Sequence, residues 1–165
     1  HMRMDRHGDQ PFGGELMRWI YEPNAEQVTH IADNLRNDDL QELLLSYSCP
    51  AQEVVLESWA QSNIVRGMAT DDGEPCGLCG VVGQRIWMLG TDRLTETRKG
   101  RWQLCVEGRK WVDSCLEELQ APLFNQVYSK NTESIRWLKY LGFTIDTPRP
   151  YGPSAALFCD FWRNF

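Results

Sequence analysis

Residues 131–143 decide the fold, and they read Asn131-Thr-Glu-Ser134-Ile135-Arg-Trp137-Leu138-Lys-Tyr140-Leu141-Gly142-Phe143. Asn131 is a residue type that caps the N-terminus of a helix. Ile135 and Leu138 then lie on one side of that helix, three residues apart. Gly142 supplies the left-handed conformation at which helices commonly end. The stretch therefore predicts a capped amphipathic helix over 132–141.

Segments with strand character flank this helix. Leu123 to Tyr128 precedes it, and Phe143 to Thr147 follows it. Residues 148–153 carry three prolines and a glycine and are predicted to form a turn, and Ala155 to Trp162 is predicted to form the last strand. The last third of the chain is therefore predicted as strand, helix, strand, strand.

A long amphipathic helix is predicted upstream, over 95–119, after a polar and basic connector over 91–101. It lies between the predicted strands 85–90 and 123–128. Two strands joined by such a crossover pair in parallel, which we expect here. The apolar side of the helix is predicted to consist of Trp102, Cys105, Val106, Val112, Cys115, Leu116 and Leu119.

The first half of the chain begins with a short strand over 16–21, followed by helices to about residue 60. Asn24 and Gln27 have the spacing of a capping box at the first helix. Three antiparallel strands then follow over 64–70, 76–82 and 85–90, the first two joined by a turn at Asp72-Gly73. The whole order predicts a mixed α/β fold with a central sheet of six or seven strands, flanked by helices.

Composition sets the class of protein. The chain has 165 residues with 17 basic and 23 acidic side chains, a net charge of −6. This length predicts one domain over 15–165, after a tag remnant at His1-Met2 and a mobile tail to residue 14. The acidic balance argues against nucleic acid as a partner. No apolar run is long enough to span a membrane or to act as a secretory signal, so a cytoplasmic protein is expected.

Six cysteines are present, and Cys76 and Cys79 form a CxxC pair. A zinc site needs two further ligands at suitable spacing, and the sequence has none. Residues three apart on a strand also point to opposite faces. We therefore expect six reduced cysteines, acting as small core residues, and no bound metal.

The segment 131–143, together with this order of elements, resembles the GNAT superfamily of acetyl-CoA-dependent N-acyltransferases. The resemblance implies that strands 85–90 and 123–128 splay apart at one end and hold acetyl-CoA between them, ready for attack by an amine acceptor. Backbone N–H groups of Met88, Leu89 or Gly90 would contact the thioester carbonyl, and Asn131 the pantetheine arm. The phosphates would lie against Arg98, Lys99, Gly100 and Arg101.

The sequence departs from the GNAT pattern at two places. The phosphate loop of the family carries two glycines, and here Gly100 is kept while Trp102 stands in the place of the second. Many members also have a tyrosine as general acid at the position of Leu138, which cannot donate a proton. Tyr140 lies about 200° further around the helix. Asp92 and Glu96 are the only nearby candidates for a base, so the catalytic residues stay unassigned.

A narrower resemblance concerns residues 86–91, 123–127 and 131–143. These stretches are similar to a family of short-tailed bacteriophage proteins that includes an internal virion protein with a degenerate GNAT-like sequence. This resemblance implies a phage or prophage origin. Two functions stay open: an acetyl-CoA-dependent N-acyltransferase, or a non-catalytic protein. The latter would be a virion or assembly protein with a phage structural partner, or an inhibitor that binds a host protein.

Overall fold

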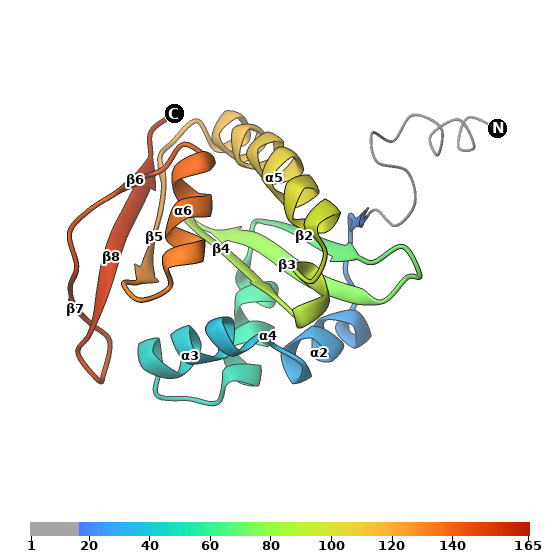
Figure 1. The fold of residues 1–165 in the computed structure, drawn as a ribbon, viewed down its shortest axis with the longest axis horizontal. Helices are drawn as coiled ribbons and strands as arrows, with labels where there is room; N and C mark the ends of the chain where they lie inside the picture. Colours follow the sequence, from blue (N-terminus) through green and yellow to red (C-terminus); the bar gives the residue numbers. More distant parts are fainter. Residues whose placement is uncertain (1–16) are drawn as a thin grey trace.

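The computed structural model describes residues 17–165, so the predicted tag remnant and tail lie outside the described residues. Eight strands form one sheet with the order β1-β2-β3-β4-β5-β8-β6, and β7 also pairs with β8 (Figure 1). The strands are β1 Arg18–Ile20, β2 Ile64–Ala69, β3 Pro75–Val82, β4 Arg85–Gly90, β5 Leu123–Tyr128, β6 Thr144–Ile145, β7 Arg149–Tyr151 and β8 Ala156–Arg163.

Helices cover both faces of this sheet (Figure 1). They are α2 Ala25–Asp33, α3 Asn37–Ser46, α4 Ala51–Gln61, the short 3-10 helix η1 Asp92–Leu94, α5 Arg98–Leu119 and α6 Thr132–Tyr140. One core cluster joins α2, α3 and α4 to Leu78 and Leu89. Another joins α5 and α6 to strands on both sides of the β4–β5 boundary. Among the described residues, no helix has the length and apolar character needed to cross a membrane.

Local sequence signals explain where several helices begin and end. Asn24 and Gln27 form the predicted capping box, each side chain accepting the other residue's backbone N–H. The Asn131 side chain accepts from Ser134 N at the start of α6, and Gly142 has a φ of 95° just past its end. The predicted helix over 132–141 is therefore confirmed, including the residues that terminate it.

The parallel pairing of β4 and β5 is also confirmed, and it is limited to one register position, Arg85 opposite Phe124. All other strand pairs are antiparallel. Beyond this position the two strands diverge. The splay lies in the middle of the sheet, between a half formed by β1–β4 and a half formed by β5–β8.

Two details differ from the sequence prediction. Residues 149–151, predicted as part of a turn, form β7, because an edge strand tolerates Pro150, and the sheet therefore has eight strands instead of the predicted six or seven. Trp102, expected on the buried side of α5, is 43% exposed. The buried side instead follows Gly100, Leu104, Gly108 and Val112 at a spacing of four. A hydrophobic pattern does not register glycine as a buried position. The predicted buried side of α5 is therefore wrong over its first turns and confirmed over its last turns.

Candidate active site

Asn125 sets the point at which β4 and β5 separate. Its side-chain amide donates to Ile86 O over 2.6 Å, and its Oδ1 accepts from Gln126 N over 2.8 Å. The amide therefore occupies the place where the two strands would otherwise bond directly. Arg85 donates to the same Oδ1 over 2.8 Å and fixes the orientation of the side chain.

The start of α3 closes the other end of the splay against β4. Gly90 N donates to Asp39 Oδ2 over 2.8 Å, and Gly90 O accepts from Arg36 N over 2.9 Å. Arg36 also binds both carboxylate oxygens of Asp39 through its side chain. Burial raises the pKa of Asp39, although the Arg36 charge and the Gly90 N–H oppose the shift. The backbone N–H and C=O of Gly90 at this end of β4 are therefore already bound by residues of the chain itself.

Glu42, one turn further along α3, reaches the opposite strand. Its Oε2 accepts from Tyr128 N over 3.0 Å and from Asn131 Nδ2 over 3.1 Å. Burial is the largest cause that raises the pKa of Glu42, to about 7, and the two hydrogen bonds oppose it. A carboxyl group with this pKa exchanges a proton readily at neutral pH, which suits a general base.

Met88 carries the free backbone groups of the splay. The backbone N–H and C=O of Gly90 bond to residues of α3 and its cap and not to β3. Backbone groups alternate in direction along a strand, so those of Met88, two residues earlier, also point away from β3 and toward β5. Because β4 and β5 pair only at Arg85, the N–H and C=O of Met88 have no strand partner on this side. The N–H of Leu89 faces β3 instead, and that of Gly90 is taken by Asp39. Of the three predicted donors, Met88 is therefore the one that is available.

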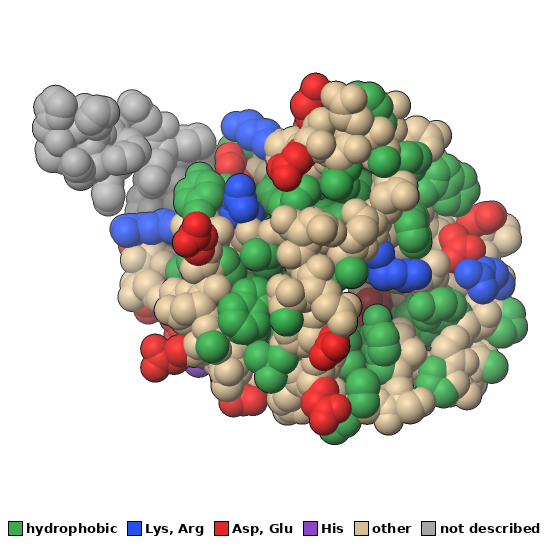
Figure 2. Space-filling view, turned by 180° about the vertical axis from the view of Figure 1, so that it is seen from behind, with side chains coloured by type: hydrophobic (Ala, Val, Ile, Leu, Met, Phe, Trp, Pro, Cys, Tyr) green, Lys and Arg blue, Asp and Glu red, His purple; other side chains and the backbone are tan. Residues whose placement is uncertain are grey.

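A cavity of about 160 Å³ passes through the sheet at the splay. Met88 and Glu42 both line it. Figure 2 shows a hollow on the rear surface with an acidic side chain at its floor. The wall on the side of α3 and α4 includes Ser46, Tyr47, Val54, Ser58, Trp87 and Tyr151. The wall on the side of α5 and α6 includes Met68, Leu104, Trp111, Val112, Trp137 and Leu138.

Two tryptophans of this lining have unsatisfied donors. The Nε1 atoms of Trp111 and Trp137 are buried, and within the described chain neither has a hydrogen-bond acceptor. Two other tryptophans of the lining are satisfied: Trp19 donates to Glu107 over 3.2 Å and Trp87 to Ser62 over 2.9 Å. Buried donors are rarely left without a partner, so the two unsatisfied indoles indicate a place for an acceptor atom.

The residues predicted to bind phosphates lie at the start of α5, where Arg98, Lys99 and Arg101 are exposed. Thr97 Oγ1 accepts from Gly100 N over 3.0 Å, so the helix supplies its own cap there. Arg101 donates to Thr95 O over 2.9 Å. The helix start therefore offers basic side chains, while its Gly100 N–H is already bound within the chain.

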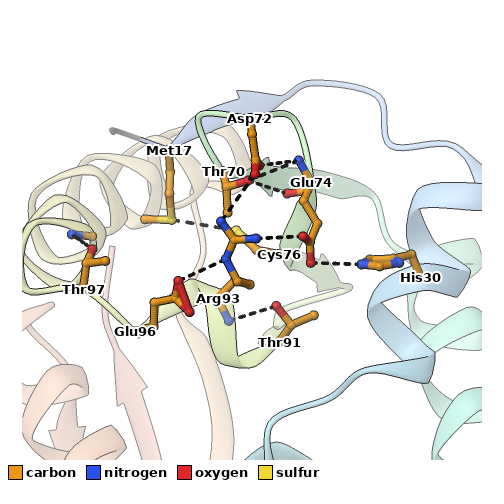
Figure 3. Close-up of polar contacts among 11 residues, drawn as sticks. Met17, His30, Thr70, Asp72, Glu74, Cys76, Thr91, Arg93, Glu96 and Thr97 are labelled. Carbon is orange, nitrogen blue, oxygen red and sulfur yellow. Dashed lines mark hydrogen bonds and ion pairs between the residues drawn. The ribbon is translucent and has the colours of Figure 1, made fainter. Parts of the chain in front are cut away.

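Carboxylates gather beside this helix start, around Arg93 (Figure 3). The Arg93 guanidinium lies 2.7 Å from Glu74, 3.1 Å from Glu96 and 3.6 Å from Asp72. The predicted base candidate Glu96 is thus in an ion pair, and neither it nor Asp92 lines the cavity at the splay. Like charges repel, so these carboxylates disfavour a phosphate group beside Arg93.

The structure brings only some of the predicted residues together. Met88 and Leu89 line the cavity, and Gly90 ends it. Asn131 is buried beside Glu42, while Leu138 lines the cavity and Tyr140 lies 49% exposed on the outer side of α6. Glu42 was missed, since an acidic residue within an amphipathic helix usually lies in solvent. The sequence gives no sign that α3 crosses the splay.

The cysteines are unpaired. Cys76 and Cys79 lie in one apolar cluster with Met68, Leu94 and Leu104, at the end where the β2–β3 register shifts. Burial raises the pKa of Cys76 to about 12, so its thiol stays protonated. Within residues 17–165 no group of three or more His, Cys, Asp or Glu side chains is arranged to hold a metal ion.

No protein-family model matches the chain, and no curated protein matches it in sequence. Solved structures do match its fold. An acetyltransferase-like protein from Acinetobacter baylyi superposes with a TM-score of 0.64 at 14% identity, covering 92% of this chain and 94% of that one. A GNAT-family acetyltransferase from Bacillus anthracis gives 0.59 at 8% identity, covering 88% and 92%. Spermidine N-acetyltransferase from Vibrio cholerae, solved with CoA and spermine, gives 0.58 at 10% identity, covering 90% and 95%. The mixed sheet, its single parallel pair and these superpositions together establish that the chain has the GNAT acetyltransferase fold.

Proposed function

We propose that this chain is an N-acyltransferase that moves the acyl group of acetyl-CoA to an amine. One observation carries the proposal: the splay brings the carboxyl group of Glu42, with a pKa of about 7, to the same cavity as the unpaired backbone of Met88. A base poised at neutral pH and a fixed N–H donor are the two groups that aminolysis of a thioester requires.

The residues have distinct roles in this reaction. Acetyl-CoA, when bound, supplies the activated carbonyl and the sulfur leaving group. The Met88 N–H donates to the carbonyl oxygen and stabilises the negative charge that grows there. The amine nitrogen bonds to the acyl carbon as the carbon–sulfur bond breaks, and Glu42 Oε1 takes the amine proton. The hydrogen bonds from Tyr128 and Asn131 both go to Oε2 of Glu42, so Oε1 is the oxygen that can accept the amine proton.

The sulfur leaves without a proton from α6. Leu138 is 8% exposed, lines the cavity and has no proton to give. A thiol has an ordinary pKa near 8.5, so its thiolate is an adequate leaving group near neutral pH. The acid that many relatives of this fold carry at this place is therefore dispensable here.

The residues present fit the acyl end of acetyl-CoA better than its phosphate end. At the acyl end Met88, Trp111 and Trp137 line one cavity, and the indole N–H groups of both tryptophans are buried without an acceptor in the described chain. At the phosphate end Arg98, Lys99 and Arg101 would contact the phosphates through side chains, because Thr97 already takes the Gly100 N–H. We therefore expect weaker binding than an open backbone cradle would give.

Two measurements test the proposal. Acetyl-CoA should raise the Tm of the protein, since a ligand of the native state stabilises by RT ln(1 + [L]/Kd), about 2.7 kcal/mol at 100 times Kd. Release of free thiol from acetyl-CoA should then depend on an added primary amine. No Tm shift at millimolar acetyl-CoA would contradict the proposal.

A second candidate function is the non-catalytic one, a phage-derived virion or assembly protein or an inhibitor of a host protein. One feature favours it: α3 already fills the splay at Gly90, with Asp39 and Arg36 on the groups that a ligand would otherwise contact. Acetyl-CoA binding with no amine-dependent thiol release, or no binding at all, would support this function over the first.

A further inference from the structure

We propose that the part of the cavity under α5 and α6 binds the acyl chain of the donor and selects chains that carry a neutral hydroxyl or carbonyl oxygen. We call this part the indole lobe, and its walls are Met68, Leu104, Trp111, Val112, Trp137 and Leu138. The inference rests on the proposed function and goes beyond it, because it names the class of acyl group.

The two unsatisfied indole N–H groups point to a ligand. Trp111 comes from α5 and Trp137 from α6, and the Nε1 atoms of both are buried without an acceptor in the described chain. Leaving two such donors unpaired is unfavourable, and buried polar groups in native proteins have partners as a rule. An oxygen atom bound beside the two indoles would supply the acceptor that the described chain does not provide.

The indole lobe adjoins the place where the thioester carbonyl would lie. The Met88 side chain packs on the same apolar cluster as Trp111 and Trp137. Its backbone N–H faces the splay, and Met88 lines the same cavity as the residues of the lobe. A chain attached to a carbonyl carbon at this N–H can therefore extend under α5 and α6.

Packing holds Trp137 in a fixed position. A Cβ on Gly108 would lie 3.2 Å from Trp137 Cζ2, so the indole ring rests directly on the backbone of α5. Leu141 supports the same region, with its Cδ2 3.5 Å from that Cβ position. A donor that is already oriented loses little freedom on binding, which favours a specific contact.

The surroundings define the chemistry of the oxygen. An N–H donor needs an acceptor, which excludes an ammonium group from the lobe. No basic side chain is among its walls, so a carboxylate would be buried there without a counter-charge. A neutral hydroxyl or carbonyl oxygen on a short apolar chain fits both conditions. The whole cavity, of which the lobe is one part, has a volume of about 160 Å³, so the chain in the lobe is short.

Three thioesters test the inference directly: acetyl-CoA, butyryl-CoA and 3-hydroxybutyryl-CoA. The last two differ by one oxygen. We expect 3-hydroxybutyryl-CoA to bind about 10-fold more tightly than butyryl-CoA in a calorimetric titration. Trp111→Phe and Trp137→Phe should bring this ratio close to one. Trp19→Phe is the matched control, because its indole N–H already donates to Glu107, and it should keep the ratio.

A second measurement uses the unaltered protein and so does not depend on how the variants fold. The chain has seven tryptophans, and each can be followed through its indole N–H signal in a ¹⁵N–¹H correlation spectrum. The signals of Trp111 and Trp137 should move downfield with 3-hydroxybutyryl-CoA and not with butyryl-CoA. Sequential backbone and side-chain assignment of the unaltered protein identifies the two signals.

Each contrary outcome has a definite meaning. Equal affinity for the two four-carbon thioesters would overturn the inference while leaving acyl transfer intact. An equal loss of affinity for all three thioesters in Trp111→Phe and Trp137→Phe would also overturn it, because the acceptor would then lie in the shared pantetheine arm. Failure of every thioester to bind, acetyl-CoA included, would overturn the proposed function and this inference together.

Discussion

Asp39 and Glu42 lie one turn apart on α3, and each accepts a backbone N–H from a different strand of the splay. Asp39 takes the N–H of Gly90 on β4, and Glu42 that of Tyr128 on β5. A spacing of three residues places both carboxylates on one side of the helix. Where β4 and β5 are too far apart to bond to each other, α3 therefore supplies a hydrogen-bond acceptor to each of them.

Replacing Glu42 by Gln should remove the base and keep the hydrogen bonds, since a Gln Oε1 can still accept from Tyr128 N. We expect acyl transfer to fall by about 10²- to 10⁴-fold. In the unaltered protein kcat/KM should rise with pH through about 7 and then level off, because only the carboxylate accepts a proton. Glu53→Gln, an exposed change on α4, should keep both the rate and this profile.

The same carboxyl group should make stability depend on pH. Its pKa is about 7 in the folded protein against 4.5 in the unfolded chain, so the folded state holds the proton between these values. The free energy of unfolding should therefore fall as pH rises from 4.5 to 7, on the order of 3 kcal/mol. Denaturant titrations should show this fall in the unaltered protein. A Glu42→Gln variant with the same pH dependence would contradict the assignment.

The basic start of α5 should matter only for ligands with phosphates. Arg98→Ala/Arg101→Ala should weaken acetyl-CoA binding by about 10-fold or more, since an Arg–phosphate contact contributes about 1.5–3 kcal/mol when it is not screened. S-acetylpantetheine, which has no phosphate, should bind the two proteins alike. Unchanged acetyl-CoA affinity in the double variant would place the phosphates elsewhere.

Asn125 should be needed for the geometry of the splay. Asn125→Asp keeps the acceptor for Gln126 N and Arg85 but replaces the donor to Ile86 O by a negatively charged oxygen. We expect a loss of about 1–3 kcal/mol in the free energy of unfolding. The loss should shrink at low pH, where the introduced carboxyl group is protonated and can donate again. A pH-independent loss would show that the donor is not the cause.

Gly90 should tolerate no side chain. A Cβ there would overlap the Leu94 side chain and lie 3.0 Å from Cys76 O. Gly90→Ala should cost about 1–3 kcal/mol, and Leu94→Ala alone about 2–5 kcal/mol because Leu94 is fully buried. The double variant should lose less than the sum, since the smaller residue 94 removes one of the two clashes. Additive losses would contradict this contact.

The sequence predicts the fold well because its signals are local. A capped helix ended by Gly142 and a long helix between two strands each leave a pattern in neighbouring residues. The site depends on contacts that the sequence does not encode locally. Glu42 is buried only because α3 crosses the splay, 86 residues away from Tyr128 in the chain. The orientation of α5 follows Gly100 and Gly108, whose role is the absence of a side chain.

The single Arg85–Phe124 pairing also has a consequence for how the chain folds. Strands β1 to β4 and strands β5 to β8 each come from one continuous stretch of sequence, with α5 between them. Each half of the sheet can form nearly all of its strand-to-strand hydrogen bonds within itself, and only the Arg85–Phe124 pairing joins the two halves. During synthesis the N-terminal half can therefore become ordered before β8 leaves the ribosome. The final step is then the docking of two preformed halves, and the cavity is the seam along which they meet.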